Sequence, residues 1–169
     1  MKLKSIILIG IIIILASIVI LLVVIVNKKS EKKELPVITL TDIFQNKSHT
    51  LTDNYGQFTI ILFFDPECDL CKDKVILLSE NCNLLKNTRL FMISVAPKEA
   101  IISFFTDNNI NINICNNIFI ISAFEEIISN KFEYPIFPSI YIYNEKNVLI
   151  KKFNYSVKID EIINSTRNK

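Results

Sequence analysis

The sequence lacks a marked excess of charge of either sign, and this bounds what the chain can bind. Its 169 residues include 19 Lys and Arg and 17 Asp and Glu, which gives a formal net charge of +2. Proteins that bind nucleic acids usually carry a strongly basic face or segment, because the phosphate backbone dominates the affinity. The composition therefore indicates no nucleic-acid partner.

Glycine and tryptophan are scarce or missing, with 2 and 0 residues. Isoleucine, asparagine and lysine are used heavily along the whole chain. This bias makes apolar runs less informative than usual, so the fold has to be inferred from spacing and motifs. No internal repeat is present, which excludes the repeat architectures that depend on a fixed period.

One long apolar run stands near the N-terminus and lacks the marks of a cleaved leader. Residues 5–26 are uncharged and almost wholly apolar, and about 20 such residues span the hydrocarbon core of a bilayer as a helix. No A-x-A-like cleavage site follows the run, and no cysteine follows a lipobox-like segment. We therefore expect a short flank at 1–4, a transmembrane anchor at 5–26, a charged linker at 27–36 and a folded domain at 37–169.

The orientation of this anchor does not follow clearly from its flanking charges. Lysines stand on both sides of the span, with a small excess on the C-terminal side, which slightly favours placing that side in the cytoplasm. The cysteines favour an oxidising compartment instead, so we expect the domain on the extracytoplasmic side of the membrane. The lysines counted are Lys2 and Lys4 before the run and Lys28, Lys29, Lys32 and Lys33 after it.

The remaining sequence alternates between strand-like and helix-like segments. Strands that alternate with helices and end in a hairpin are typical of an α/β domain with a central mixed β-sheet flanked by helices. The expected strands are a hairpin within 37–53, buried strands at 58–64, 89–96 and 110–115, and a second hairpin at 139–144 and 148–153. The expected helices are 69–80, 97–109, 118–129 and 156–164.

The segment that carries chemistry is "FFDPECDLCK", residues 63–72, where a buried strand leads into a helix. Cys68 then stands over the unpaired backbone N–H groups at the helix start, where the helix dipole favours an anion. A thiolate is stabilised at such a position, as in other C-x-x-C motifs. The offset of three residues lets Cys71 reach back over one helical turn and close a disulfide with Cys68.

The same two cysteines allow other interpretations. They could be an unreactive buried pair, or half of a zinc site that takes further ligands from Cys82, Cys115 and His49. None of these three forms a second close pair, which disfavours the metal. We expect Cys82 and Cys115 to be small buried hydrophobic residues, although a disulfide between them is possible, and His49 to be a solvated side chain.

Several stretches resemble the membrane-tethered thioredoxin-like proteins of the TlpA/redoxin type. These are "PVITLTDIFQNKSHTLTDNYGQFTIILFFDPECDLCKDKV", "LFMISVAPKEAIISFF" and "FPSIYIYNEKNVLIKKF", and the likeness covers residues 36 to about 165. The resemblance implies a thioredoxin-like fold, with Cys68 as the nucleophile and Cys71 as the resolving thiol. It also implies that Pro138 is a cis-proline that faces the two cysteines and the substrate peptide.

The sequence departs from that family at the positions that usually assist the thiols. Glu67 replaces the aromatic residue before the first cysteine, and residues 69–70 lack the usual proline. Leu62 and Lys74 stand where relatives carry an acidic residue that moves protons. The carboxylates at Asp65, Glu67 and Asp69 would oppose a thiolate by repulsion, which biases the pair toward the reductant role.

Two other activities of related domains fit the residues poorly. A peroxidase needs a Thr or Ser and a proline at spacings that Asp65 and Ile61 occupy here. A copper chaperone of the Sco kind needs C-x-x-x-C and a downstream histidine, and the chain has neither.

The sequence therefore predicts a membrane-tethered thiol–disulfide oxidoreductase that acts on protein disulfides. No cofactor is expected, but a membrane or thioredoxin-type electron donor must reduce the pair again. The main alternative is a redox-inactive thioredoxin-fold scaffold on the same anchor, and a zinc- or copper-handling module ranks last.

Overall fold

The computed structural model describes residues 10–21, 33–53, 56–112, 115–132 and 135–167. The chain forms two compact units, Met1–Lys33 and Glu34–Lys169, each of which is described by itself. In the first unit, residues 10–21 are helical. No helix within the described ranges combines the length and the hydropathy that a bilayer span needs. The ends of the anchor expected at 5–26, namely 5–9 and 22–26, lie outside the described residues.

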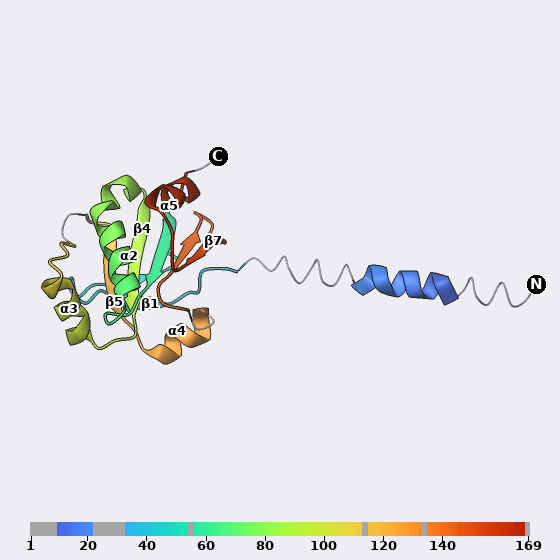
Figure 1. The fold of residues 1–169 in the computed structure, drawn as a ribbon, viewed down its shortest axis with the longest axis horizontal. Coiled ribbons are helices and arrows are strands. Elements are labelled where there is room, and N and C mark those ends of the chain that lie inside the picture. The colour runs from blue at the N-terminus through green and yellow to red at the C-terminus, as the bar shows by residue number, and fades with distance from the viewer. Residues whose placement is uncertain (1–9, 22–32, 54–55, 113–114, 133–134, 168–169) are drawn as a thin grey trace, which may run out of the picture. The chain divides into compact units, whose positions relative to one another are not determined.

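The second unit is built around a five-stranded mixed sheet in the order β5-β4-β3-β6-β7 (Figure 1). Strands β3, β4 and β5 run parallel, while β6 and β7 run antiparallel to their neighbours. This confirms the α/β fold class and the mixed sheet. The strands are β3 (Phe58–Phe63), β4 (Thr88–Ser94), β5 (Ile118–Ser122), β6 (Ser139–Tyr143) and β7 (Leu149–Asn154).

Strand β3 lies at the centre of the sheet because its residues are apolar on both faces. All six of its residues are buried, as expected for a run of β-branched and aromatic side chains. Successive side chains point to opposite faces, so Ile60 and Leu62 join one core cluster while Ile61 and Phe63 join the other. The strand is thus fixed from both sides, and so is the point at which it ends.

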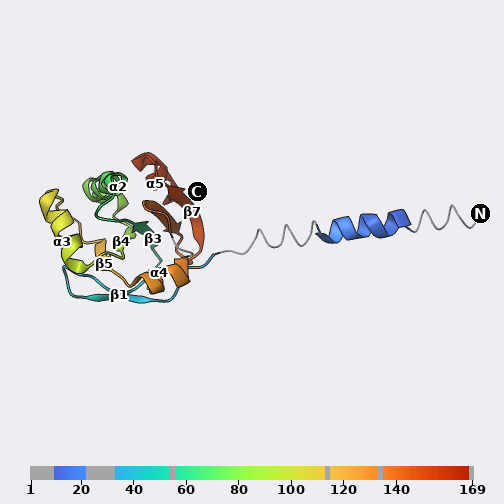
Figure 2. The same cartoon turned by 60° about the horizontal axis from the view of Figure 1, so that its bottom comes forward.

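Helices cover both faces of the sheet (Figure 2). Helices α2, α3 and α5 contribute to the core on one face, and α4 contributes to the core on the other face together with the β1–β2 hairpin. The predicted helix at 69–80 is confirmed to the residue. The helices are α2 (Asp69–Glu80), α3 (Lys98–Asp107), α4 (Glu125–Phe132) and α5 (Ile159–Ser165), with a short 3₁₀ turn, η1 (Cys82–Leu85), after α2.

The hairpin expected within 37–53 is present as β1 (Thr39–Thr41) and β2 (Ser48–Thr50), which form a separate two-stranded sheet. Its turn is tied to β5 by Asp42, a carboxylate that is only 1% exposed. The carboxylate accepts backbone N–H groups from Phe44 and Gln45 in its own turn and from Ile120 in β5. Asp42 therefore caps the open edge of the main sheet, which would otherwise present unpaired backbone groups.

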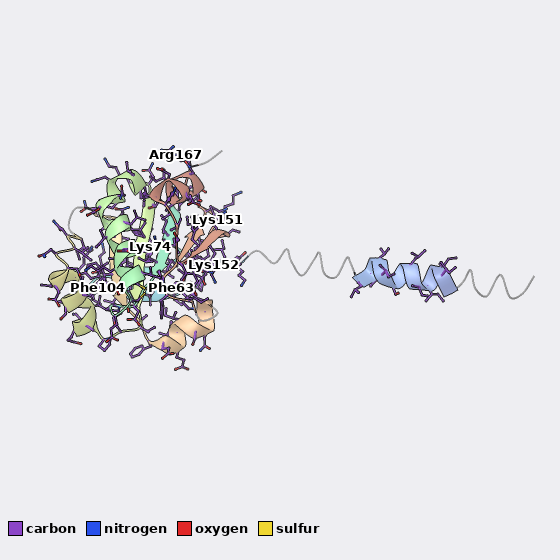
Figure 3. All side chains as sticks on the ribbon, viewed as in Figure 1. Phe63, Lys74, Phe104, Lys151, Lys152 and Arg167 are labelled. Atoms are coloured by element: carbon purple, nitrogen blue, oxygen red, sulfur yellow. A yellow bond between two sulfur atoms is a disulfide. The ribbon has the colours of Figure 1, made fainter. Side chains whose placement is uncertain are left out.

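Strand β7 forms the opposite edge, and it is mostly exposed. It carries two adjacent lysines, Lys151 and Lys152, which Figure 3 shows beside the strand. Each ammonium group lies over an aromatic ring, Lys151 over Phe153 at 5.5 Å and Lys152 over Tyr141 at 4.7 Å. Charged side chains on an edge strand oppose pairing with another chain.

Two predicted elements between α3 and α4 were wrong. The strand expected at 110–115 does not exist among its described residues, and the helix expected at 118–129 is divided into β5 and α4. Its first half, "IFIIS", has β-branched and aromatic side chains that fill both faces of the sheet, so burial favours a strand there. In residues 110–112 asparagine alternates with isoleucine, and these three residues lie outside the sheet.

Candidate active site

The loop that carries Cys68 is held at the end of the central strand. β3 ends at Phe63, and the next residue, Phe64, still donates its N–H to the Ile93 carbonyl at 3.0 Å. Helix α2 begins at Asp69, so the chain turns from strand to helix within five residues. Cys68 is the N-cap residue of α2, in extended backbone conformation. The structure thus places this cysteine where the sequence predicted it, at the helix start.

The two cysteines contact each other through the first helical turn. The Cys68 sulfur accepts the N–H of Cys71 at 3.3 Å, which satisfies one of the unpaired donors at the helix start. The Cys68 carbonyl accepts the N–H groups of Cys71 and Lys72 at 3.0 and 3.1 Å. Cys68 is partly exposed, whereas Cys71 is fully buried, and both are free thiols. An exposed sulfur in front of a buried one fits an attacking thiol followed by a resolving thiol.

Burial raises the pKa of the Cys71 thiol from 9.0 to about 12. The hydrogen bond with Cys68 and the charges of Cys68 and Asp65 contribute to this rise, while a backbone hydrogen bond from Asp65 opposes it. Cys71 therefore stays protonated at neutral pH and does not compete with Cys68 as a nucleophile.

We expect this thiol to lower the stability of the reduced protein at alkaline pH. Between pH 9.0 and about 12 the unfolded chain loses the Cys71 proton while the folded chain keeps it. The free energy of unfolding should therefore be unaffected by Cys71 below pH 9.0 and should fall above it. Denaturant unfolding over this range, with the pair kept reduced under nitrogen, should show a steeper fall for the wild type than for Cys71→Ala. If the free energy of unfolding fell equally with pH in both proteins, the raised pKa of Cys71 would be contradicted.

Asp65 fixes the conformation of the loop before Cys68. Its carboxylate accepts the N–H of Glu67 at 2.9 Å, and its carbonyl accepts the N–H of Cys68 at 3.2 Å. This is the local turn that an aspartate favours when it precedes a proline. The sequence indicated an effect of the Asp65 charge on Cys68, and the same charge also contributes to the raised pKa of Cys71. The "DPE" turn signal before the first cysteine could have revealed this placement.

Pro138 lies at the same edge of the sheet as the two cysteines. The Phe137–Pro138 peptide bond is cis. The following residue, Ser139, pairs with Phe63, so the register sets Pro138 beside the loop that leaves β3. The Pro138 carbonyl accepts the N–H of Tyr155 at 3.1 Å. The three residues predicted for the site, Cys68, Cys71 and Pro138, therefore meet at one edge of the sheet.

Leu62 and Lys74 are the two residues that replace acids of the related family. Leu62 is fully buried in the core between the sheet and the helices. Lys74 lies on α2 (Figure 3), and its ammonium group donates to the Val157 carbonyl at 3.3 Å, ahead of α5. Neither side chain can accept a proton from Cys71, because one is apolar and the other is a cation.

Cys82 and Cys115 form a disulfide, with 33 residues of sequence separation and Cα atoms 6.2 Å apart. The expectation that each is simply a small buried hydrophobic residue was therefore wrong. The bond joins η1, after α2, to the loop before β5, which brings together positions that the sequence could not show to be close. It also uses both sulfurs that a zinc site would have needed. In the described part of the chain, no three His, Cys, Asp or Glu side chains are grouped as metal ligands.

The prediction that His49 is a solvated side chain was wrong, because its ring is half-buried against two aromatic side chains. Its ring lies 4.2 Å from the Phe119 ring and 6.4 Å from the Phe91 ring, centre to centre. Burial and the nearby positive charges of Arg89 and Lys47 lower the pKa of His49. The alternation of β2 could have indicated that one of its side chains faces the sheet.

A surface depression of about 700 Å³ is lined by His49 and not by Cys68. It opens at the edge where β4 and β5 begin, and Arg89 lines it. The Arg89 guanidinium donates to the carbonyls of Thr50 and Leu51, so this charge holds the hairpin on the sheet. The depression therefore lies where the hairpin meets the sheet, and the two cysteines lie at the opposite edge.

Comparison with known proteins shows that this chain is similar to others in its fold. No protein-family model matches the sequence, and no curated protein matches it. Among solved structures, a secreted disulfide oxidoreductase of Mycobacterium tuberculosis homologous to E. coli DsbE has a TM-score of 0.61 at 17% identity, covering 76% of this chain and 93% of its own. The thioredoxin domain of a Bacteroides vulgatus thiol–disulfide oxidoreductase has a TM-score of 0.60 at 16% identity, covering 79% and 94%.

The likeness extends to a mitochondrial 2-Cys peroxiredoxin of Plasmodium falciparum, with a TM-score of 0.63 at 16% identity, covering 80% of this chain and 90% of the other. The chain thus has the thioredoxin-like fold that the sequence predicted. At these identities the fold alone is shared, and function has to be inferred from the site.

Proposed function

We propose that this chain is a membrane-tethered thiol–disulfide oxidoreductase that acts on protein disulfides. The observation that carries the proposal is the pair of thiols at the start of α2. The partly exposed Cys68 sulfur accepts the N–H of Cys71, and the buried Cys71 thiol lies behind it. The Cys68 thiolate attacks a substrate disulfide, and Cys71 then attacks Cys68 and releases the reduced substrate.

The substrate segment is expected to lie beside Pro138 in an extended conformation. Apolar side chains are exposed in the segments that surround the cysteines at this edge: Leu70 is 53% exposed, Ile136 49% and Tyr155 51%. They offer contacts to an apolar peptide on either side of its disulfide. The chemistry requires no cofactor, but a membrane or thioredoxin-type donor of electrons must reduce the Cys68–Cys71 disulfide after each turnover.

The acidic neighbours of Cys68 favour a reductant over an oxidant. Glu67 and Asp69 are exposed beside the first cysteine, and Asp65 precedes them. Negative charges destabilise a thiolate, and a pair with a less stable thiolate form gives up electrons more readily. A redox titration that gives a potential as oxidising as that of DsbA would contradict this part of the proposal.

Two features support an anchored domain on the extracytoplasmic side. The helical residues 10–21 belong to the apolar run 5–26, which has the length of a bilayer span. The disulfide between Cys82 and Cys115 is of a kind that persists in oxidising compartments and is rare in the cytosol. Reporter fusions at the C-terminus would test this topology directly.

Insulin reduction tests the proposed reaction. The full chain, purified in a mild detergent with dithiothreitol as electron source, should accelerate the reduction of insulin disulfides. In Cys71→Ser the mixed disulfide should persist, because the second thiol that resolves it is missing. Cells that carry this variant should then yield covalent complexes that reductant separates. Absence of both turnover and trapped complexes would favour a redox-inactive scaffold, the alternative suggested by Glu67, Leu62 and Lys74.

A further inference from the structure

The depression that His49 lines takes no part in the chemistry proposed for the two cysteines. Its volume of about 700 Å³ is that of a small-molecule site. Segments far apart in the sequence form its walls: the β1–β2 hairpin with the residues after it, the stretch from η1 to the start of β4, and the loop before β5. A ligand here would lie at the opposite end of the sheet from Cys68, so its binding is independent of the proposed function.

The charges that line the depression are mostly positive. Lys47 comes from the hairpin, Lys86 follows η1, and Arg89 belongs to β4. Among the described residues of the lining, Asp53 is the one carboxylate that faces these three cations. The whole chain has a formal net charge of only +2, so the excess is a local feature. A hollow lined mainly by one sign of charge concentrates ligands of the opposite sign.

The two lysines at the rim are available to a ligand. Both are exposed, and neither ammonium group makes a hydrogen bond or an ion pair with a residue that the structure describes. Each ammonium group offers three donors and no acceptor. Asn83 and Asn116 add exposed amide groups to the same lining, which suits a polar ligand and not an apolar one. Exposed lysines alone do not make a site, so the buried part of the lining has to be considered as well.

Arg89 supplies a buried charge that is already fixed in position. It is only 8% exposed, and its guanidinium donates to the carbonyls of Thr50 and Leu51 at 3.0 to 3.1 Å. The same group lies 4.8 Å from the centre of the Phe91 ring. A charge that is held in this way adds to the attraction of an anion without the cost of ordering a long side chain.

His49 gives an independent sign that a polar partner is missing. Its Nε2 atom is buried and makes no hydrogen bond within the described part of the chain. Buried polar atoms are nearly always paired, so an unpaired one in the lining of a depression is a place for a ligand or a water molecule. Burial and then the charges of Arg89 and Lys47 lower the pKa of His49, while the charge of Asp42 opposes this shift. The field of the cations therefore reaches this side chain.

We propose that the depression binds a small ligand that carries at least two phosphate or carboxylate groups. Lys47 and Lys86 come from different segments, so each can bind a separate anionic group. Hydrogen bonds between an ammonium group and an oxyanion are among the stronger polar contacts in proteins. Arg89 stabilises the bound charge from the buried side, and Asp53 limits the affinity by repulsion.

Titration of the full chain with pyrophosphate, at constant ionic strength, tests the proposal. The chain has a single histidine, so the imidazole signal of an untagged protein in NMR spectra reports on the depression alone. We expect a saturable shift of this signal. The bound anion should also raise the pKa of His49, because a negative charge favours the imidazolium form. A parallel titration with citrate identifies the group that is preferred, phosphate if pyrophosphate binds more tightly and carboxylate if citrate does.

Three variants make the result specific. K47Q/K86Q should weaken the binding of pyrophosphate by about tenfold or more, because it removes two charge-assisted hydrogen bonds. The matched control K151Q/K152Q removes the same charge from β7 and should bind as the wild type does. D53N should bind several-fold more tightly, and this gain cannot result from misfolding.

Two results would overturn the proposal. One is the absence of a saturable shift of the His49 signal with both pyrophosphate and citrate. The other is equal affinity in K47Q/K86Q and K151Q/K152Q, since binding would then follow the net charge of the chain and not this depression. Neither result depends on the two cysteines, so the proposed redox function would stand or fall separately.

Discussion

Replacing Cys68 by serine is expected to lower the rate of insulin reduction by on the order of 10³-fold or more, to the rate of the dithiothreitol background. Removal of a covalent nucleophile usually leaves only the residual contribution of substrate binding. Cys71 cannot take over the role, because its thiol is fully buried and its pKa is raised to about 12. The measurement is the initial rate of insulin precipitation with the full chain and a fixed concentration of dithiothreitol.

The comparison with Cys71→Ser makes this result specific. Both variants should lose turnover, but only Cys71→Ser should accumulate a covalent complex. In the reduced wild type, alkylation at neutral pH should label Cys68 before Cys71. Thermal unfolding of the two variants should be alike, so that lost activity is not lost structure. Residual turnover in Cys68→Ser, or a trapped complex in that variant, would show that the roles of the cysteines were assigned the wrong way round.

Loss of the Cys82–Cys115 disulfide is expected to lower the free energy of unfolding by about 3–4 kcal/mol. A crosslink restricts the unfolded chain, and for loops of a few tens of residues the effect lies in this range. The bond closes a loop over 33 residues, which contains β4 and α3. Denaturant unfolding of the double variant Cys82→Ala/Cys115→Ala should therefore show a clearly lower midpoint than the wild type.

The matched control is Cys68→Ala/Cys71→Ala, which removes the same number of sulfur atoms without opening a long loop. The free energy of unfolding of this control should fall much less, because Cys68 and Cys71 are free thiols and their replacement removes no crosslink. A loss below about 1 kcal/mol in the Cys82/Cys115 variant would mean that the crosslink does not constrain the unfolded chain as the loop-entropy argument requires.

Local patterns predicted the centre of the fold well. The run 58–64 and the helix 69–80 were found because a buried strand and a capped helix each have a strong local signal. The two cysteines follow from the same junction, and Pro138 followed from the family resemblance. The helix start that carries both cysteines therefore lies where neighbouring residues in the sequence determine the structure.

Features that depend on distant residues could not be predicted in the same way. Residues 118–122 form a strand and not a helix because they pair with β4, which is distant in the sequence. The Cys82–Cys115 bond joins two segments that only the finished sheet brings together. His49 lies against Phe91 and Phe119 because the hairpin folds over the sheet, and the residues it contacts there are far away in the sequence.

The N-terminal end of the folded unit lies far from Cys68. Glu34 forms an isolated bridge with Val148, and Leu35 donates its N–H to Asn147, both in the connection between β6 and β7. This connection lies at the edge where β3 begins, whereas Cys68 follows the end of β3. A strand of six residues spans about 20 Å, so residues 34–35 and Cys68 lie about the length of β3 apart. Under the proposed function, a client protein would therefore dock at the opposite end of β3 from residues 34–35, where the preceding chain joins the domain.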